Sequence, residues 1–158
     1  MVTEMTKEQI QNFTVRIANC NKTELVVVTY DIILTYMEEA ENSYHKGDVE
    51  NFLFNIKKAR QYVNNLTSTL NLDYSISLEL LRLYMFIDKS LFTNIIKKQP
   101  VNMECMTDMV QKLKAAFIEV AKEDKTGALL NNTSEVYAGY TYSRGNSNNI
   151  NLNEMVMR

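Results

Sequence analysis

The sequence NKTELVVVTYDIILTYMEEAENSYH, residues 21–45, decides the fold of this chain, because its apolar residues recur at helical spacing without an interrupting glycine or proline. The run LVVVTY within it is rich in β-branched residues, which favour strands. The helical period nevertheless continues beyond that run to Tyr44. Residues 21–45 are therefore predicted to form one helix, about 35 Å long.

This predicted helix carries two apolar stripes, whereas one stripe is enough to seat a helix on a core. The first stripe consists of Leu25, Val28, Ile32 and Tyr36, and the second of Val26, Tyr30, Ile33, Met37, Ala40 and Tyr44. A helix predicted to have Ser75 or Ser77 as its N-cap and to end near Lys98 repeats the pattern. One of its faces carries Ile76, Leu80, Tyr84, Ile87, Leu91 and Ile95, and the other carries Leu78, Leu81, Met85, Phe92 and Ile96. The surplus stripes must be covered by more of the fold or by a partner.

Capping residues mark two further helices in the first half of the chain. Thr6 and Gln9 fit a capping box at the start of a short N-terminal helix. Gly47 fits the residue that follows a helix C-terminus, and Asp48 fits the next N-cap. A single apolar stripe follows Asp48 and continues to Leu70, which predicts a helix with one buried face.

Pro100 separates the last two predicted helices, because proline does not readily continue a helix. Asn102 is predicted to cap the final helix, and Gly127 is predicted to close it. The connections are short, so successive helices should run antiparallel. The prediction is an all-α chain with an N-terminal arm containing a short extra helix (1–20), an antiparallel up-and-down four-helix bundle (21–127) and a flexible low-complexity C-terminal tail (128–158).

The composition limits the classes of function. A chain of 158 residues fits one domain with a substantial core, and its formal net charge of −2 argues against an electrostatic grip on nucleic acid or on an anionic membrane. No apolar leader is evident, and the apolar runs are too short to span a bilayer. Cys20 and Cys105 are isolated thiols, expected to be buried or half-buried and to suit a reducing compartment.

No catalytic or metal-binding constellation competes with the binding signal. His45, the one histidine, is expected at a helix C-terminus, where the helix dipole favours a cation. No spacing of His or Cys completes a metal site, and no phosphate-binding loop or nucleophile motif occurs. We therefore expect neither enzyme activity nor a cofactor. Asp31 lies among apolar residues and is expected either to pair with a Lys or Arg of another helix or to contact a client directly.

The order of several short segments resembles the flagellin-specific export chaperone family FliS. The resemblance extends from about Cys20 to Lys122. It is carried by Thr23-Glu-Leu-Val-Val-Val-Thr-Tyr30-Asp31, Ala40, Gly47-Asp48, Lys58-Ala59-Arg60, Thr69-Leu70-Asn71-Leu72-Asp73, Leu83-Tyr84-Met85 and Leu113-Lys114-Ala115-Ala116-Phe117. The resemblance implies a bacterial cytoplasmic helical bundle that binds the disordered C-terminal region of flagellin. It also implies that such binding prevents premature polymerisation and helps deliver flagellin to the flagellar export apparatus.

The client surface is predicted from the surplus stripes and not from the family. We expect the client to contact Leu78, Leu81, Met85, Phe92 and Ile96, and less directly Val26, Tyr30, Ile33 and Met37. A generic helical adaptor, or a bundle that dimerises through the same stripes, remains the alternative. The free chain is accordingly expected to be a monomer or a weak homodimer. The apolar residues of the tail could also fold back into the groove of their own chain or enter the groove of a neighbouring molecule.

Overall fold

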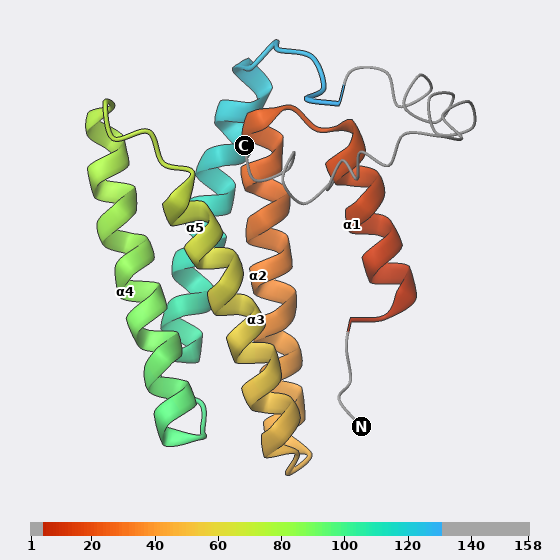
Figure 1. The fold of residues 1–158 in the computed structure, drawn as a ribbon, viewed down its shortest axis with the longest axis vertical. Coiled ribbons are helices and arrows are strands. Elements are labelled where there is room, and N and C mark those ends of the chain that lie inside the picture. Colours follow the sequence, from red (N-terminus) through yellow and green to blue (C-terminus); the bar gives the residue numbers. More distant parts are fainter. Residues whose placement is uncertain (1–4, 131–158) are drawn as a thin grey trace, which may run out of the picture.

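The computed structural model describes residues 5–130 of the chain. Five helices form this part, with no strand among the described residues, which confirms the predicted all-α class. The helices are α1 (Lys7–Asn19), α2 (Lys22–His45), α3 (Val49–Ser68), α4 (Ser75–Lys97) and α5 (Met103–Glu123). Helices α2 to α5 alternate in direction, and α1 lies outside them against α2 (Figure 1). Most of the predicted tail, residues 131–158, lies outside the described residues.

Local capping explains where most of these helices begin. Thr6 and Asn21 each form a complete capping box, with Gln9 and Glu24 as the respective partners. The side chain of Asp48 accepts a hydrogen bond from the backbone N–H of Asn51 and so caps α3. The predicted helix starts at Thr6, Asn21 and Asp48 are confirmed. The predicted cap at Ser75 or Ser77 is wrong, because the N-cap of α4 is Tyr74, whose side chain makes no capping hydrogen bond.

The loop between α4 and α5 is fixed by a buried side chain that the sequence did not reveal. Asn102 precedes α5 as predicted, but it has a left-handed backbone and its side chain makes no capping hydrogen bond. Instead the amide of Asn94 accepts from the backbone N–H of Val101 at 2.8 Å and donates to the carbonyl of Val101 at 2.9 Å. Asn94 is fully buried, so α4 itself holds the start of the next helix in place.

The prediction that Gly127 closes the last helix is wrong, since α5 ends at Glu123. Asp124 leaves the helix with an extended backbone. Its carboxylate accepts hydrogen bonds from the Thr126 backbone N–H at 2.9 Å and from the Thr23 hydroxyl at 2.6 Å. These hydrogen bonds stop α5 four residues before the glycine and tie its C-terminal end to the start of α2.

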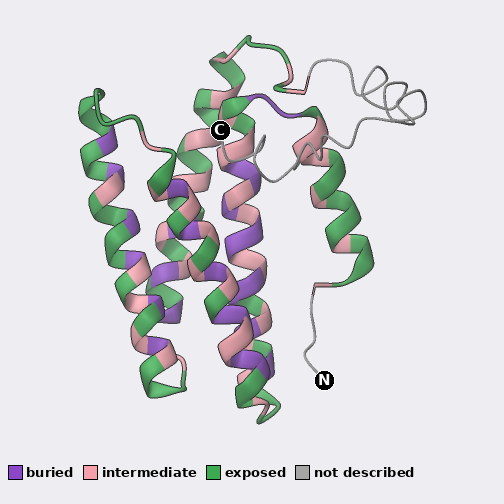
Figure 2. Ribbon diagram, in the orientation of Figure 1, coloured by how far each residue is buried: buried purple, intermediate pink, exposed green. Residues whose placement is uncertain are grey.

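The core is centred on α2, which contacts α1, α3 and α5 (Figure 2). Nine residues of α2 are buried, whereas α1 has none. Inside the bundle, the hydroxyl groups of Tyr30 on α2 and Tyr84 on α4 lie 2.5 Å apart, and Phe117 of α5 packs edge-on against the Tyr30 ring. This pair satisfies two polar groups that would be costly to bury alone.

Burial raises the pKa of both Tyr30 and Tyr84, because loss of water disfavours the phenolate. Because the pKa is raised in the folded state, the stabilisation from the protonated tyrosines is fully present below the unfolded-state pKa of about 10. It is lost as the pH rises above that value. The free energy of unfolding should therefore fall by about 1.4 kcal/mol per pH unit above pH ~10 for each tyrosine that ionises only when unfolded.

We predict that the double variant Tyr30→Phe/Tyr84→Phe will lose less stability than the wild-type protein between pH 9 and 11. Urea unfolding across that range measures the slope. Tyr74→Phe is the matched control, because Tyr74 is 64% exposed, and its slope should follow that of the wild type. Parallel slopes for the double variant and the wild type would show that the buried pair does not govern the alkaline response.

Candidate partner-binding surface

Helix α4 carries seven of the fourteen large apolar side chains that residues 5–130 leave exposed. Of the predicted client residues on this helix, Leu78, Met85, Phe92 and Ile96 are 44–65% exposed and Leu81 is half-buried. Nine of the fourteen large apolar side chains that stay exposed in residues 5–130 lie between Leu72 and Ile96. The other stripe of α4 faces inward, with Leu80, Tyr84, Ile87 and Leu91 in the core.

The secondary prediction for α2 has to be corrected. Tyr30, Ile33 and Met37 are each only 1% exposed, and Val26 is half-buried against the core. The reason is that α2 is surrounded by three helices, so both of its stripes are used inside the monomer. In this structure Tyr30, Ile33 and Met37 have no surface to offer a client.

The exposed surface of α4 is broader than the sequence predicted. Ile76, expected on the core face, is 59% exposed in the first turn of the helix. Leu83 and Phe86, which belong to neither predicted stripe, are also exposed. The sequence did indicate a broader apolar surface, because α4 has apolar residues on more than two sides. Periodicity alone could not predict which of these sides would lack a neighbouring helix.

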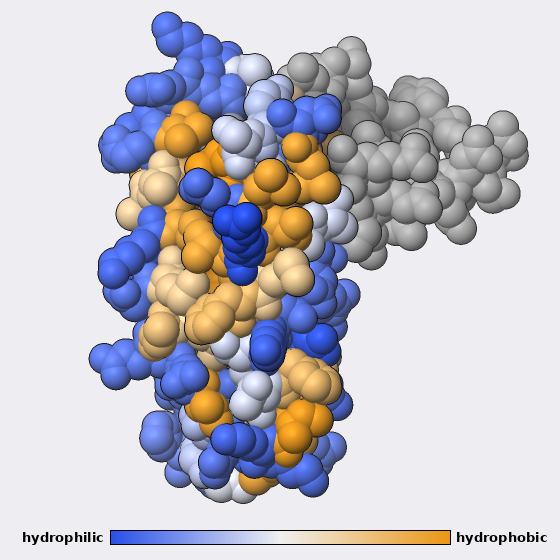
Figure 3. All heavy atoms as spheres, turned by 90° about the vertical axis from the view of Figure 1, so that its left-hand side faces the viewer, coloured by the Kyte–Doolittle hydropathy of each residue, from blue (hydrophilic) through white to orange (hydrophobic). Residues whose placement is uncertain are grey.

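The position of α4 at the edge of the bundle explains this exposure. Helix α4 makes its main helix contacts with α3, and α5 makes its main contacts with α2, so α4 and α5 share no interface of comparable extent. Figure 3 views the molecule from the α4 side and shows apolar groups gathered on this face, interrupted by charged ones. The outer side of α4 is therefore open to a partner.

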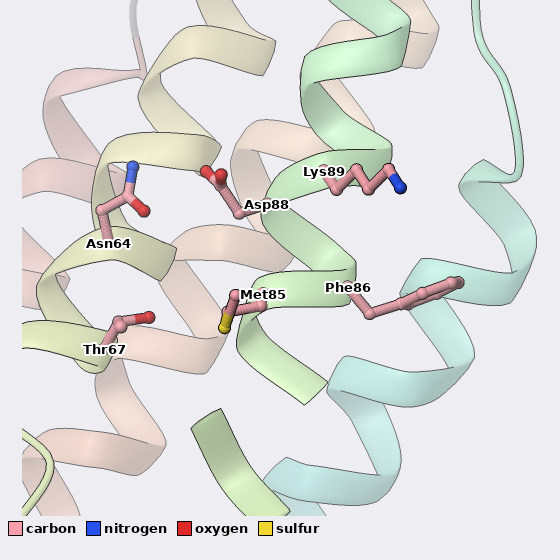
Figure 4. Close-up of a pocket in the computed structure, with 6 residues that line it drawn as sticks. All are labelled: Asn64, Thr67, Met85, Phe86, Asp88 and Lys89. Carbon is pink, nitrogen blue, oxygen red and sulfur yellow. The ribbon is translucent and has the colours of Figure 1, made fainter. Parts of the chain in front are cut away.

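A shallow groove of about 350 Å³ runs between α3 and α4. It is lined by Asn64 and Thr67 from α3 and by Met85, Phe86, Asp88 and Lys89 from α4. Met85 points across the groove toward Thr67, whereas Phe86 extends away from it on the opposite side of the helix (Figure 4). Apolar groups thus flank both sides of α4, with amide, hydroxyl and charged groups available beside Met85.

An ion pair fastens α4 to α3 beside this groove. The Arg60 guanidinium donates to both carboxylate oxygens of Asp88, at 2.7 and 3.3 Å. The same guanidinium lies 4.8 Å from the centroid of the Phe92 ring, within the range of a cation–π contact. Arg60 therefore positions an exposed aromatic ring of the predicted client surface while joining the two helices.

Asp31 does pair with cations of other helices, as the sequence predicted. Its carboxylate contacts Arg16 of α1 at 2.7 Å and Lys114 of α5 at 2.5 Å. The Asp31 side chain is only 17% exposed, so this bridge is better shielded from solvent than most surface ion pairs. One carboxylate on the central helix thus links α2 both to α5 and to α1, a helix that has no fully buried residue.

A second depression, of about 460 Å³, lies where α1, α2 and α5 meet. Cys20 lies in its wall, and burial raises the pKa of this thiol, which favours its protonated form. Cys105, in contrast, is exposed, so the expectation that both thiols would be covered is wrong for this one. Within residues 5–130 no cluster of His, Cys, Asp and Glu could hold a metal ion, and no helix is long and apolar enough to cross a membrane.

The fold and this surface define a class of protein, namely a helical bundle in which one edge helix, α4, exposes an apolar side that a partner could contact. The family model described as flagellar protein FliS matches residues 5–124, a range that contains all five helices, from Lys7 to Glu123. The chain therefore belongs to the FliS family, a family of flagellar chaperones. Comparison with curated proteins found no matching relative.

We predict that Asp31→Asn will lower the free energy of unfolding by about 1–2 kcal/mol, because it leaves Arg16 and Lys114 without their shared anion. Chemical denaturation measures the loss. Asp108→Asn is the matched control: Asp108 pairs with Lys112 on the exposed surface of α5, and its loss should cost less than about 0.5 kcal/mol. Equal effects of the two substitutions would contradict a special role for Asp31.

Proposed function

We propose that this protein is a cytoplasmic flagellar secretion chaperone that binds the disordered C-terminal region of flagellin. Binding would keep flagellin from polymerising before export and would help deliver it to the export apparatus. The observation that carries the proposal is the concentration of exposed apolar side chains on α4, in a chain of the FliS family. A surface of this kind supports binding and requires no catalytic group.

The form of the surface favours a client that folds as an amphipathic helix beside α4. Helix-in-groove recognition uses apolar anchors spaced one or two turns apart. The exposed residues Leu78, Met85, Phe92 and Ile96 have spacings of seven, seven and four, which place them along one side of α4. Methionine adapts its shape to different partners, so Met85 suits a client whose side chains vary along its length.

The expected affinity suits a carrier that must release its load. Burial of a few hundred Å² of apolar surface contributes several kcal/mol at about 25 cal/mol per Å². Ordering a disordered client costs about 2–5 kcal/mol of that gain. The balance favours dissociation constants between micromolar and nanomolar, tight enough to hold flagellin and weak enough to let it go.

A different function would use the same surface in another way. A generic adaptor would take a client unrelated to flagellin, and a homodimer would bury α4 against its counterpart by symmetry. Measurement of molecular mass at several protein concentrations separates a dimer from a monomer with a free α4. A pull-down with full-length flagellin, and with flagellin truncated at its C-terminus as control, separates flagellin from other clients.

We predict that Met85→Lys and Ile96→Lys will each weaken binding of a flagellin C-terminal segment at least about tenfold, because each places a charge on the apolar contact. Isothermal titration calorimetry measures the affinity, and circular dichroism should stay helical because both side chains are at least 60% exposed.

Val15→Lys is the matched control for this experiment, since Val15 is 55% exposed but lies on α1. Its affinity should remain within about twofold of the wild-type value. Unchanged affinity in folded Met85→Lys and Ile96→Lys proteins would exclude the outer side of α4 as the flagellin site.

A further inference from the structure

The described chain ends close to one end of the bundle, where hydrogen bonds hold the residues that follow α5. After α5, the backbone N–H of Leu129 donates to the carbonyl of Cys20 at 3.0 Å, beside the hydrogen bond between Asp124 and Thr23. Because α4 and α5 are antiparallel, the C-terminal end of α5 and the first turn of α4 lie at the same end of the molecule (Figure 1). Residues 131–158 therefore start beside α1, at the end of the bundle at which α4 begins but across the bundle from that helix.

The sequence after Leu130 contains a segment whose chemistry matches that surface. Its last residues include the apolar group Ile150, Leu152, Met155, Val156 and Met157. Leu152, Met155 and Val156 have the spacing that places side chains on one face of a helix. Two acidic and two basic residues balance across 131–158, so net charge does not oppose an approach to α4.

Residues 131–149 are long enough for the apolar segment that begins at Ile150 to reach α4. Nineteen residues, 131–149, separate the last described residue from Ile150 and can span about 60 Å when extended. Helix α4 is about 35 Å long at about 1.5 Å per residue, and Met85 lies near its middle. A binding segment on the same chain also acts at an effective concentration on the order of millimolar, so even a weak contact would be populated.

We propose that residues 150–157 bind the exposed side of α4 in their own chain, where Leu78, Met85 and Phe92 form the contact surface. The competition part of this proposal rests on the proposed function: the segment occupies the place of the flagellin client and is displaced by it. A segment that fills the surface about nine-tenths of the time lowers the apparent affinity for the client about tenfold. The free chaperone would then hide its apolar surface until a client with more contacts arrives.

The test uses the full-length chain with [methyl-13C]methionine and follows the methyl resonance of Met85, assigned with Met85→Leu. Leu152→Asp and Val156→Asp should each shift this resonance, because the charged segment no longer covers it. Asn153→Asp is the matched control, with the same added charge and no apolar loss, and should leave the resonance unchanged. A Met85 resonance that is the same in all four proteins overturns the proposal.

Two further measurements complete the test. The difference in the Met85 methyl chemical shift between Val156→Asp and the wild type should not depend on protein concentration. A shift difference that grows with concentration would assign the contact to a second copy of the chain and overturn binding within one chain. Leu152→Asp and Val156→Asp should bind the flagellin C-terminal segment about tenfold more tightly than Asn153→Asp. Equal affinities would overturn the competition. Absence of flagellin binding in every variant would defeat the proposed function alone, since the Met85 resonance still decides whether the segment contacts α4.

Discussion

The burial of both apolar stripes of α2 is the constraint on which the rest of this structure depends. A helix with two apolar stripes needs neighbours on several sides, and α2 obtains them from α1, α3 and α5. Once α2 occupies the centre, α4 packs mainly against α3 and is linked to α2 by the hydrogen bond between Tyr84 and Tyr30. The edge position of α4, and hence the exposed apolar surface, follows from this arrangement.

The apolar surface of α4 is compatible with a folded monomer because the inner side of the same helix is well anchored. Leu80, Tyr84, Ile87 and Leu91 are buried, and Asn94 fixes the following loop. The ion pair between Arg60 and Asp88 adds a polar link at the rim. A partner can therefore bind or leave the outer side without disturbing the core, as the proposed function requires.

Hydrogen bonds at one end of the bundle determine where the described chain ends. The start of α2, the end of α5 and residues 124–130 are joined by hydrogen bonds into one rigid corner. The described chain therefore ends beside α1, at the end of the bundle at which α4 begins. A chaperone with an exposed apolar face faces the risk of association with itself or with wrong partners, and a tethered competitor lowers that risk without adding to the fold.

Local sequence determined the helices themselves. Capping boxes at Thr6 and Asn21, the cap at Asp48 and the break at Pro100 depend on residues within a few positions of one another, so the helix starts could be predicted closely. The ion pairing of Asp31 was also predictable, because a carboxylate among apolar residues needs a cation. The outer face of α4, from Leu78 to Ile96, was predicted as apolar surplus, and the structure leaves most of it exposed.

Only the tertiary structure decided which apolar stripe would find a neighbour. Periodicity gave α2 and α4 equivalent surplus faces, yet Tyr30 and Met37 are in the core while Met85 and Ile96 are exposed. Asn94 could not be identified as the residue that clamps the last loop, because its partner Val101 lies across a turn whose geometry no local pattern specifies. The physical reason is the same in both cases. The sequence shows that an apolar stripe needs burial and that a polar group needs a hydrogen-bond partner, but the packing of distant segments decides which residues provide them.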